Sequence, residues 1–187
     1  MGFIGRIVTA GWNAREMSAR DFIWLAGLGS AARGPVELDD IFRAIASITA
    51  GQWLPVGELV TTATAEMERS GHLRMVSPQN SRLCLTERGM QTLLLLLDQP
   101  LPRPGTVLGQ VGVRFRLAFL DLMEDEVRRA CLLDMTEAYR TEIQSRVIEA
   151  PCPACGPLGI AWDAHDLDRL RTELALLEQM AVTSATP

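Results

Sequence analysis

The sequence contains no lysine, so all 18 of its permanently charged basic side chains are arginines. Acidic residues number 23, and the formal net charge is −5 at pH 7. Because nucleic-acid binding draws affinity from neutralised phosphates, this acidic balance argues against DNA binding. A local basic face stays compatible with it, since arginine binds phosphate and guanine through two hydrogen bonds at once.

Long apolar runs are also missing. The leucine run Leu93–Leu97 has five residues, whereas a helix needs about 20 apolar residues to cross a bilayer. Residues 1–17 carry Arg6 and no sustained apolar stretch, which does not fit a secretory signal. We therefore expect a cytoplasmic protein with no membrane partner.

Residue sets typical of catalysis are not evident either. The two histidines, His72 and His165, lie in different regions, and the sequence has no glycine-rich phosphate loop and no nucleophile–base–acid set. The carboxylates are spread over positions expected to face solvent. The sequence therefore predicts a binding protein rather than an enzyme.

The clearest pattern lies between Leu54 and Gly89. Pro55 suits the first turn of a helix and Gly71 suits the left-handed position past its end, which predicts a helix over 55–70. Two short runs of alternating apolar residues follow, separated by turn residues, and they predict a β-hairpin. The inward positions of this hairpin are Leu73, Met75, Leu83 and Leu85. Helix, tight turn and hairpin form the second half of a winged helix-turn-helix.

Further helices are predicted on both sides of this stretch. Ser18 suits the N-cap of a helix over 19–32, and a second helix over 37–50 carries an apolar stripe behind an acidic start. Thr86 is expected to cap a helix after the hairpin that completes the core with Met90, Leu93, Leu94 and Leu97. The predicted class is mainly α with a small β-hairpin wing.

These motifs resemble the PadR-like winged-helix regulators. The resemblance rests on Glu66–Leu73 and on Leu83-Cys84-Leu85-Thr86-Glu87-Arg88-Gly89, and it covers residues 18–98. The helical second half favours this family over other winged helices. The family usually has Tyr-Pro where this chain has Thr61-Thr62, and most of the basic residues expected nearby are absent. The resemblance implies a DNA-binding transcriptional regulator, expected to be a repressor.

The helix over 55–70 is the candidate recognition helix, whose exposed first half enters the major groove in this architecture. Its inward face is expected to hold Leu59, Ala63 and Met67, with Val60 as a further candidate. The wing arginines lie outside the apolar hairpin positions and could hold phosphate. The predicted DNA-binding residues are Thr61, Thr62, Arg69, Arg74 and Arg82. The alternatives are a solvated amphipathic helix, and wing arginines that pair with Glu66, Glu68 or Glu87.

The stiff segment Leu101–Gly105 predicts a boundary between a winged-helix domain over 18–100 and a helical dimerisation or effector region over 106–187, with an arm over 1–17 before them. The helical region is expected to run from 111 to 149, with an interruption near Cys131, and to resume at Asp163. A coiled-coil seam is predicted at Leu167, Leu170, Leu174 and Leu177. We expect this seam to form a homodimer, as the resemblance also implies; packing within one chain is the alternative.

Cys152-Pro153-Ala154-Cys155-Gly156 has the spacing of half a zinc site. His165, Asp163 or the same pair from a second subunit would have to complete it. A redox dithiol and a plain structural turn are the alternatives. No cofactor is therefore expected, with zinc at Cys152 and Cys155 as the one alternative.

The resemblance also implies a small aromatic effector bound in the helical half, although the four tryptophans are expected to serve core packing. The leading hypothesis is a dimeric regulator that binds double-stranded DNA. One alternative is a winged-helix protein-interaction module that has lost DNA binding. Another is a zinc- or redox-responsive regulator that uses Cys152 and Cys155.

Overall fold

The structure is a computed structural model that describes residues 15–77, 80–149 and 154–183. Helices dominate these residues, and one antiparallel pair of strands accompanies them. The predicted class, mainly α with a small β-hairpin, is confirmed. None of the described helices combines the length and apolar composition that a bilayer span requires.

The chain divides into two units. The first unit consists of the described residues up to Pro102 together with Val111–Leu120. The second consists of Arg103–Gln110 together with the described residues from Asp121 onward. The predicted second region, 106–187, included Val111–Leu120, which this division groups with the first unit.

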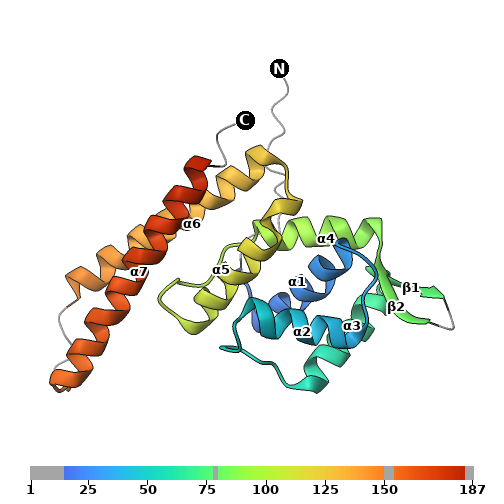
Figure 1. The fold of residues 1–187 in the computed structure, drawn as a ribbon, viewed down its shortest axis with the longest axis horizontal. Coiled ribbons are helices and arrows are strands. Elements are labelled where there is room, and N and C mark those ends of the chain that lie inside the picture. The colour runs from blue at the N-terminus through green and yellow to red at the C-terminus, as the bar shows by residue number, and fades with distance from the viewer. Residues whose placement is uncertain (1–14, 78–79, 150–153, 184–187) are drawn as a thin grey trace. The chain divides into compact units, whose positions relative to one another are not determined.

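The first unit is a helical core with a hairpin projecting from one end (Figure 1). Its elements are α1 (Ala19–Ala32), α2 (Leu38–Ile48), α3 (Gly57–Arg69), β1 (Leu73–Ser77), β2 (Asn80–Leu85), α4 (Glu87–Asp98) and the part of α5 (Val107–Phe119) from Val111 onward. The order of helices and strands is the one predicted for a winged helix.

Helix α1 begins at the N-cap that the sequence predicts. The carboxylate of Asp21 accepts hydrogen bonds from the backbone and the hydroxyl of Ser18, both at 2.7 Å, and pairs with Arg15. Burial alone would raise the pKa of Asp21, but the hydrogen bonds from Arg15 and Ser18 outweigh burial and hold the pKa below its ordinary value. Arg15, near the end of the expected arm over 1–17, is therefore held against α1. Residues 1–14 of this arm lie outside the described residues.

Aromatic packing explains why α5 belongs to the first unit. The rings of Phe22 and Phe115 stack with centroids 5.8 Å apart, and Trp53 meets both rings edge-on. Val111 and Phe119 of α5 are also buried. A boundary placed at the proline-rich linker misses this return of the chain, because linker composition does not report where the next apolar stripe packs.

The hairpin pairs Leu73 with Leu85 and Arg74 with Cys84. Leu73 and Leu83 are buried as predicted. The prediction for Met75 is wrong, since its side chain is 41% exposed; a bulge follows Met75, where the hairpin leaves the core. The turn residues 78–79 lie outside the described part.

A further bridge at the base of the hairpin was not predicted. Val36, between α1 and α2, exchanges two backbone hydrogen bonds with Leu83, at 2.9 and 2.7 Å. A single paired residue has no alternating pattern, so the sequence gives little signal for it. The bridge fixes the hairpin to the start of α2.

The Leu-Thr-Glu-Arg-Gly motif joins α4 to the end of α3. The Thr86 hydroxyl donates to the carbonyl oxygens of Gly71 and His72, at 2.7 and 3.0 Å, and accepts from the Gly89 amide at 3.0 Å. Gly71 has a φ of 74°, which confirms the left-handed residue past the helix. In α4 Leu93 and Leu97 are buried as predicted, with Leu96, whereas Met90 and Leu94 are half-buried.

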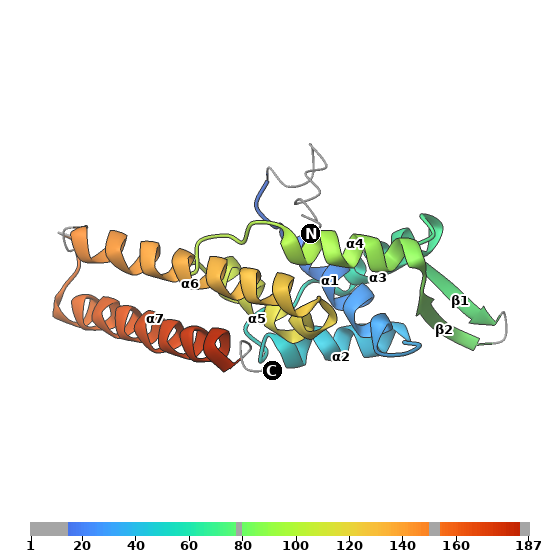
Figure 2. The ribbon, with the colours of Figure 1, turned by 90° about the horizontal axis from the view of Figure 1, so that it is seen from above.

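The second unit is a helical hairpin. Figure 2 shows α6 (Asp125–Ile148) and α7 (Pro157–Thr183) side by side. Leu132, Met135 and Tyr139 of α6 are buried, and the Tyr139 hydroxyl donates to Glu173 of α7 at 3.0 Å. The helices are therefore joined by an apolar seam with a polar bond across it.

A buried carboxylate ties α6 to the segment before α5. Glu142 lies 2.9 Å from Arg103 Nε and 3.1 Å from Arg146 Nε, and Arg146 also donates to the Gly105 carbonyl at 3.1 Å. Burial alone would raise the pKa of Glu142, but the hydrogen bonds from the two arginines hold it below the ordinary value.

The helix boundaries after residue 106 differ from those predicted. The interruption falls between Phe119 and Asp125, where a short 3₁₀ turn over Leu120–Leu122 ends α5, and Cys131 lies inside α6. α7 begins at Pro157 rather than Asp163, because proline is well placed in a first helical turn.

Candidate nucleic-acid interface

Helix α3 packs on the core through one face and presents the other. Val60, Ala63, Thr64 and Met67 are buried at the spacing of a helical stripe. The expected inward position of Leu59 is wrong, since this side chain is 56% exposed. Steps of four residues drift by about 40° each, so a stripe through 59, 63 and 67 leaves the true buried face at its first member.

The outward face of α3 carries Glu58, Thr62, Ala65 and Arg69, which lie opposite the buried stripe. Thr61, on the flank, is exposed too, and its hydroxyl donates to the Gly57 carbonyl at 3.0 Å. The predicted exposure of Thr61 and Thr62 is confirmed. This face follows the α2–α3 turn, where a winged helix contacts the major groove.

Arg74 and Arg82 emerge from the same face of the hairpin. Arg74 is paired with Cys84, and Arg82 stands two residues from Cys84 on β2, so strand alternation directs both side chains to one side. Arg82 Nε lies 3.2 Å from a Glu37 carboxylate oxygen, an acidic partner that was not among those considered. Within the described residues, the guanidinium groups of Arg69 and Arg74 form no ion pair or hydrogen bond, and both residues are exposed.

Two carboxylates near this surface are neutralised inside the chain. Glu66 pairs with Arg20 of α1, whose guanidinium also lies over the Trp24 ring, 5.9 Å from its centroid. Glu37 pairs with Arg82. The surface is therefore less acidic than the residue count indicates, and Glu58 is an exposed carboxylate for which the described residues supply no partner.

The base of the wing is held by a buried histidine. The His72 ring meets Trp24 edge-on at 5.0 Å, and its Nδ1 lies 2.7 Å from the Ser70 hydroxyl. Burial lowers the pKa of His72, and the positive charge of Arg88 lowers it further. A neutral ring at pH 7 follows, so His72 orients the wing without adding charge.

The predicted dimer seam is partly occupied within the chain. Leu170 and Leu177 are buried on the α7 face that packs against α6, and Leu167 and Leu174 are half-buried. A second apolar stripe, about 90° from Leu170 and Leu177 around the helix, is formed by Leu158, Trp162, Leu176 and Met180. Its first three members are exposed.

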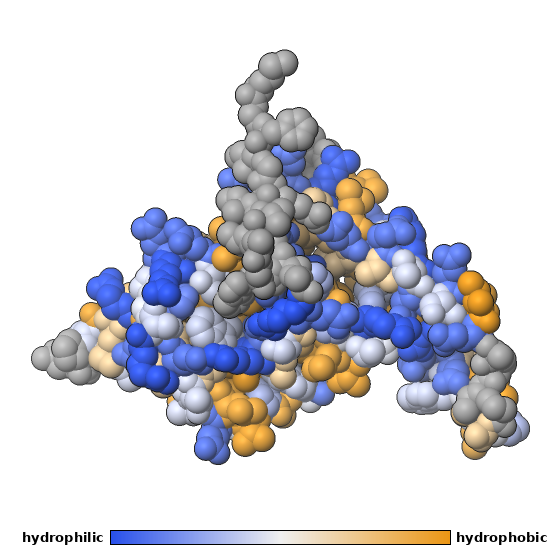
Figure 3. All heavy atoms as spheres, turned by 180° about the vertical axis from the view of Figure 1, so that it is seen from behind, coloured by the Kyte–Doolittle hydropathy of each residue, from blue (hydrophilic) through white to orange (hydrophobic). Residues whose placement is uncertain are grey.

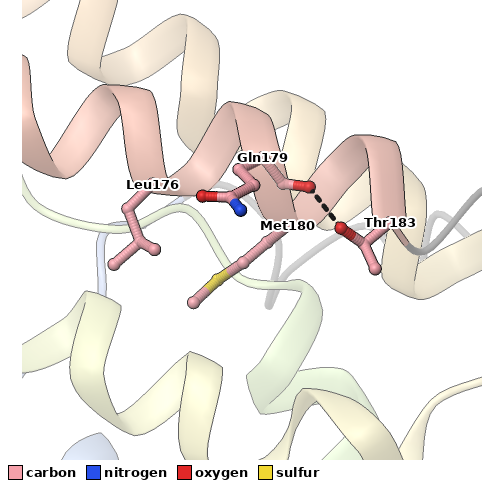
Figure 4. Close-up of a pocket in the computed structure, with 4 residues that line it drawn as sticks. All are labelled: Leu176, Gln179, Met180 and Thr183. Atoms are coloured by element: carbon pink, nitrogen blue, oxygen red, sulfur yellow. Dashed lines mark hydrogen bonds between the residues drawn. The ribbon is translucent and has the colours of Figure 1, made fainter.

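Figure 4 shows Leu176 and Met180 extending from one side of α7, with Gln179 and Thr183 beside them. These four side chains line a shallow hollow of about 390 Å³. The Thr183 hydroxyl donates to the Gln179 carbonyl at 2.8 Å, and so the hollow has a polar rim at one end.

The predicted zinc site falls partly outside the described residues, because Cys152 belongs to 150–153. Among the described residues, no group of three or more histidine, cysteine or carboxylate side chains is placed to hold a metal ion. His165, a proposed ligand, lies with its ring 5.5 Å from that of Trp162.

The order α1, bridge, α2, α3, hairpin, α4 defines a winged helix-turn-helix protein. The sequence matches no protein-family model and no curated protein. By structure, the chain is similar to a crystal structure of Bacillus subtilis PadR, with a TM-score of 0.41, 14% identity and coverage of 92% of this chain and 100% of that one.

Two complexes of the same protein are also similar to it. The complex with operator DNA has a TM-score of 0.37 and 15% identity, and covers 87% of this chain and 98% of that one. The complex with p-coumaric acid has a TM-score of 0.40 and 16% identity, and covers 88% and 99%. The DNA and the acid are ligands of that protein; what this chain binds follows from its own residues.

Proposed function

We propose that this chain binds double-stranded DNA through α3 and the β1–β2 wing, and that it regulates transcription as a repressor. The observation that carries the proposal is the exposed face of α3 beside Arg69 and Arg74, two cations without intramolecular partners among the described residues. In a winged helix, these positions lie next to the duplex.

The charges make the binding modest and salt-dependent. Each phosphate that an arginine neutralises releases counterions, so the logarithm of affinity falls by about 0.9 per contact for each tenfold rise in salt. Arg82 contributes less than Arg74, because the duplex competes with Glu37 for its guanidinium. Thr62 and Thr61 supply short side chains that let α3 approach the groove closely.

The proposal includes a homodimer formed through the second unit. Leu170 and Leu177 are engaged with α6, so the surface proposed for the second copy is the exposed stripe of Leu158, Trp162 and Leu176. A two-fold axis through this surface would present two α3 helices to two half-sites.

The proposal also includes a small aromatic effector. The hollow beside Leu176 and Met180 has a volume within the range of small-molecule sites, with apolar walls and a polar rim. An effector bound on α7 would compete with or stabilise the proposed dimer surface, since Leu176 belongs to both.

The experiment is a salt titration of binding to a random-sequence duplex by the full chain. The native protein is expected to show affinity that falls with salt, and Arg74→Ala is expected to reduce the slope by about 0.9. Arg43→Ala is the matched control, because Arg43 is exposed on α2 and already paired with Asp40 at 2.6 Å. Equal slopes for Arg74→Ala and the native protein would contradict the proposed contact.

A protein-interaction module remains the second candidate, and one observation favours it. The start of α3 exposes Leu54, Val56 and Leu59 next to the acidic Glu58. Such a surface suits a basic, apolar partner helix. If the native chain binds no duplex even at low salt, this candidate replaces DNA binding.

A further inference from the structure

The side chains on the exposed half of α3 are poor in hydrogen-bond donors. All of α3 is described, and before Arg69 its outward face carries a carboxylate at Glu58, a methyl group at Ala65 and a hydroxyl at Thr62. On the flanks, Leu59 is apolar, and the Thr61 hydroxyl already donates its proton to the Gly57 carbonyl. What this face offers a ligand is mainly an acceptor and apolar surface.

The base edges in the major groove differ in what they require. Guanine presents two acceptors, which call for a donor such as arginine. Cytosine presents an amine donor, which a carboxylate accepts, and thymine presents a methyl group, which apolar side chains contact. Adenine also presents an amine, but beside an acceptor atom that a carboxylate repels. The α3 face therefore complements the amine of cytosine and the methyl group of thymine, with Glu58 placed on the cytosine strand of a C·G pair and away from the guanine acceptors.

We infer that α3 selects its binding site by accepting a hydrogen bond from a cytosine amine at Glu58 and by packing Leu59 and Ala65 against thymine methyl groups. The inference rests on the proposed DNA binding and adds the bases that are read. Arg69, at the C-terminal end of α3, and Arg74, on the strand that follows, then serve phosphates, which separates base reading from charge neutralisation.

The apolar surface at the start of α3 supports the same assignment. Val56, the N-cap residue of α3, is 67% exposed and lies three residues before Leu59. Figure 3 shows that hydrophilic side chains cover much of one face of the molecule, with apolar groups reaching the surface in separate patches. The apolar patch at the start of α3 would be removed from water where it contacts a row of thymine methyl groups.

The first test uses duplexes enriched from a random library by the full-length chain. Affinity for an enriched duplex is measured by fluorescence anisotropy, and then for the same duplex with thymine replaced by deoxyuridine, which lacks only the methyl group. Each contacted methyl is expected to contribute about fourfold in affinity, from the transfer energy of one carbon group. Unchanged affinity with deoxyuridine would overturn the apolar part of the inference.

The second test exchanges the acceptor. Glu58→Gln adds a donor and is expected to move the preference at one position from cytosine to adenine, by about 5- to 150-fold. Glu68→Gln is the matched control, since it removes the same charge from the flank of the same helix. Both variants lose one negative charge and its repulsion of phosphate, but only Glu58→Gln should change the preferred base, with weaker binding at the cytosine position.

The outcomes separate the two proposals. If no duplex binds at any salt, the proposed function fails and the inference with it. If duplexes bind but deoxyuridine leaves the affinity unchanged and Glu58→Gln leaves the base preference unchanged, DNA binding stands and the reading by α3 is overturned.

Discussion

Substituting Gly89 by alanine should destabilise the first unit, because the α4 helix starts directly on the turn after α3. A Cβ atom at Gly89 would lie 2.2 Å from the His72 carbonyl oxygen and 2.7 Å from Leu85 Cδ1. The carbonyl cannot simply withdraw, since it accepts hydrogen bonds from the amide and the hydroxyl of Thr86, at 3.1 and 3.0 Å. Either α4 moves or these bonds break.

The expected cost is the difference of three effects. Overpacking costs about 2 kcal/mol, and one weakened hydrogen bond about 1 kcal/mol. The higher helix propensity of alanine returns about 1 kcal/mol. The free energy of unfolding should therefore fall by about 2 kcal/mol, seen as a lower urea midpoint in tryptophan fluorescence and circular dichroism.

Gly57→Ala is the matched control for this experiment. A Cβ at Gly57 would meet the Phe42 ring at 3.7 Å, an ordinary contact, at the first position of α3. Its stability should stay unchanged or rise by up to about 1 kcal/mol. If Gly89→Ala is as stable as the native chain, the close packing of α4 on His72 is refuted.

Two other predictions concern charge and assembly. Asp21 and Glu142 have depressed pKa values, so their stabilisation is present above the ordinary carboxyl pKa and is lost as the pH falls below it towards their folded-state pKa values. Below about pH 4, the free energy of unfolding of Glu142→Gln should therefore fall less steeply with pH than that of the native chain. A slope equal to that of the native chain in circular dichroism would contradict this. Trp162→Glu should produce a monomer in sedimentation, whereas Leu133→Glu, at an exposed position of α6, should leave the assembly unchanged; equal behaviour of the two would refute the α7 surface.

Much of the first unit follows from local patterns. Ser18, Gly71 and Thr86 mark helix ends through their own chemistry, so their roles could be predicted one residue at a time. The hairpin position follows equally from its alternation. These signals act over a few residues, which is why the order of elements from α1 to α4 was predictable.

Other features depend on contacts between segments distant in sequence. The bridge of Val36 to Leu83 and the ion pair of Arg82 with Glu37 join segments more than 40 residues apart. Neither has a signature in its own neighbourhood. The packing of Phe115 on Phe22 is of the same kind, and it places part of α5 in the first unit.

The candidate site could be predicted only in part, because its packing also depends on contacts between segments distant in sequence. Periodicity identified Thr61 and Thr62 as exposed, but a stripe drawn through every fourth residue drifts off the buried face before it reaches Leu59. Leu170 and Leu177 were predicted to form a dimer seam, because a heptad pattern indicates a packed helix face but not whether the partner helix belongs to the same chain. Here α6 supplies that helix.

The most direct measurement of the central claim is the salt dependence of DNA binding for Thr62→Arg, which adds one cation to the middle of the outward α3 face. If this face meets the duplex, affinity should rise and the slope should steepen by about 0.9, while Leu133→Arg in the second unit leaves both unchanged. If Thr62→Arg and Leu133→Arg give the same slope as the native chain, α3 does not face DNA.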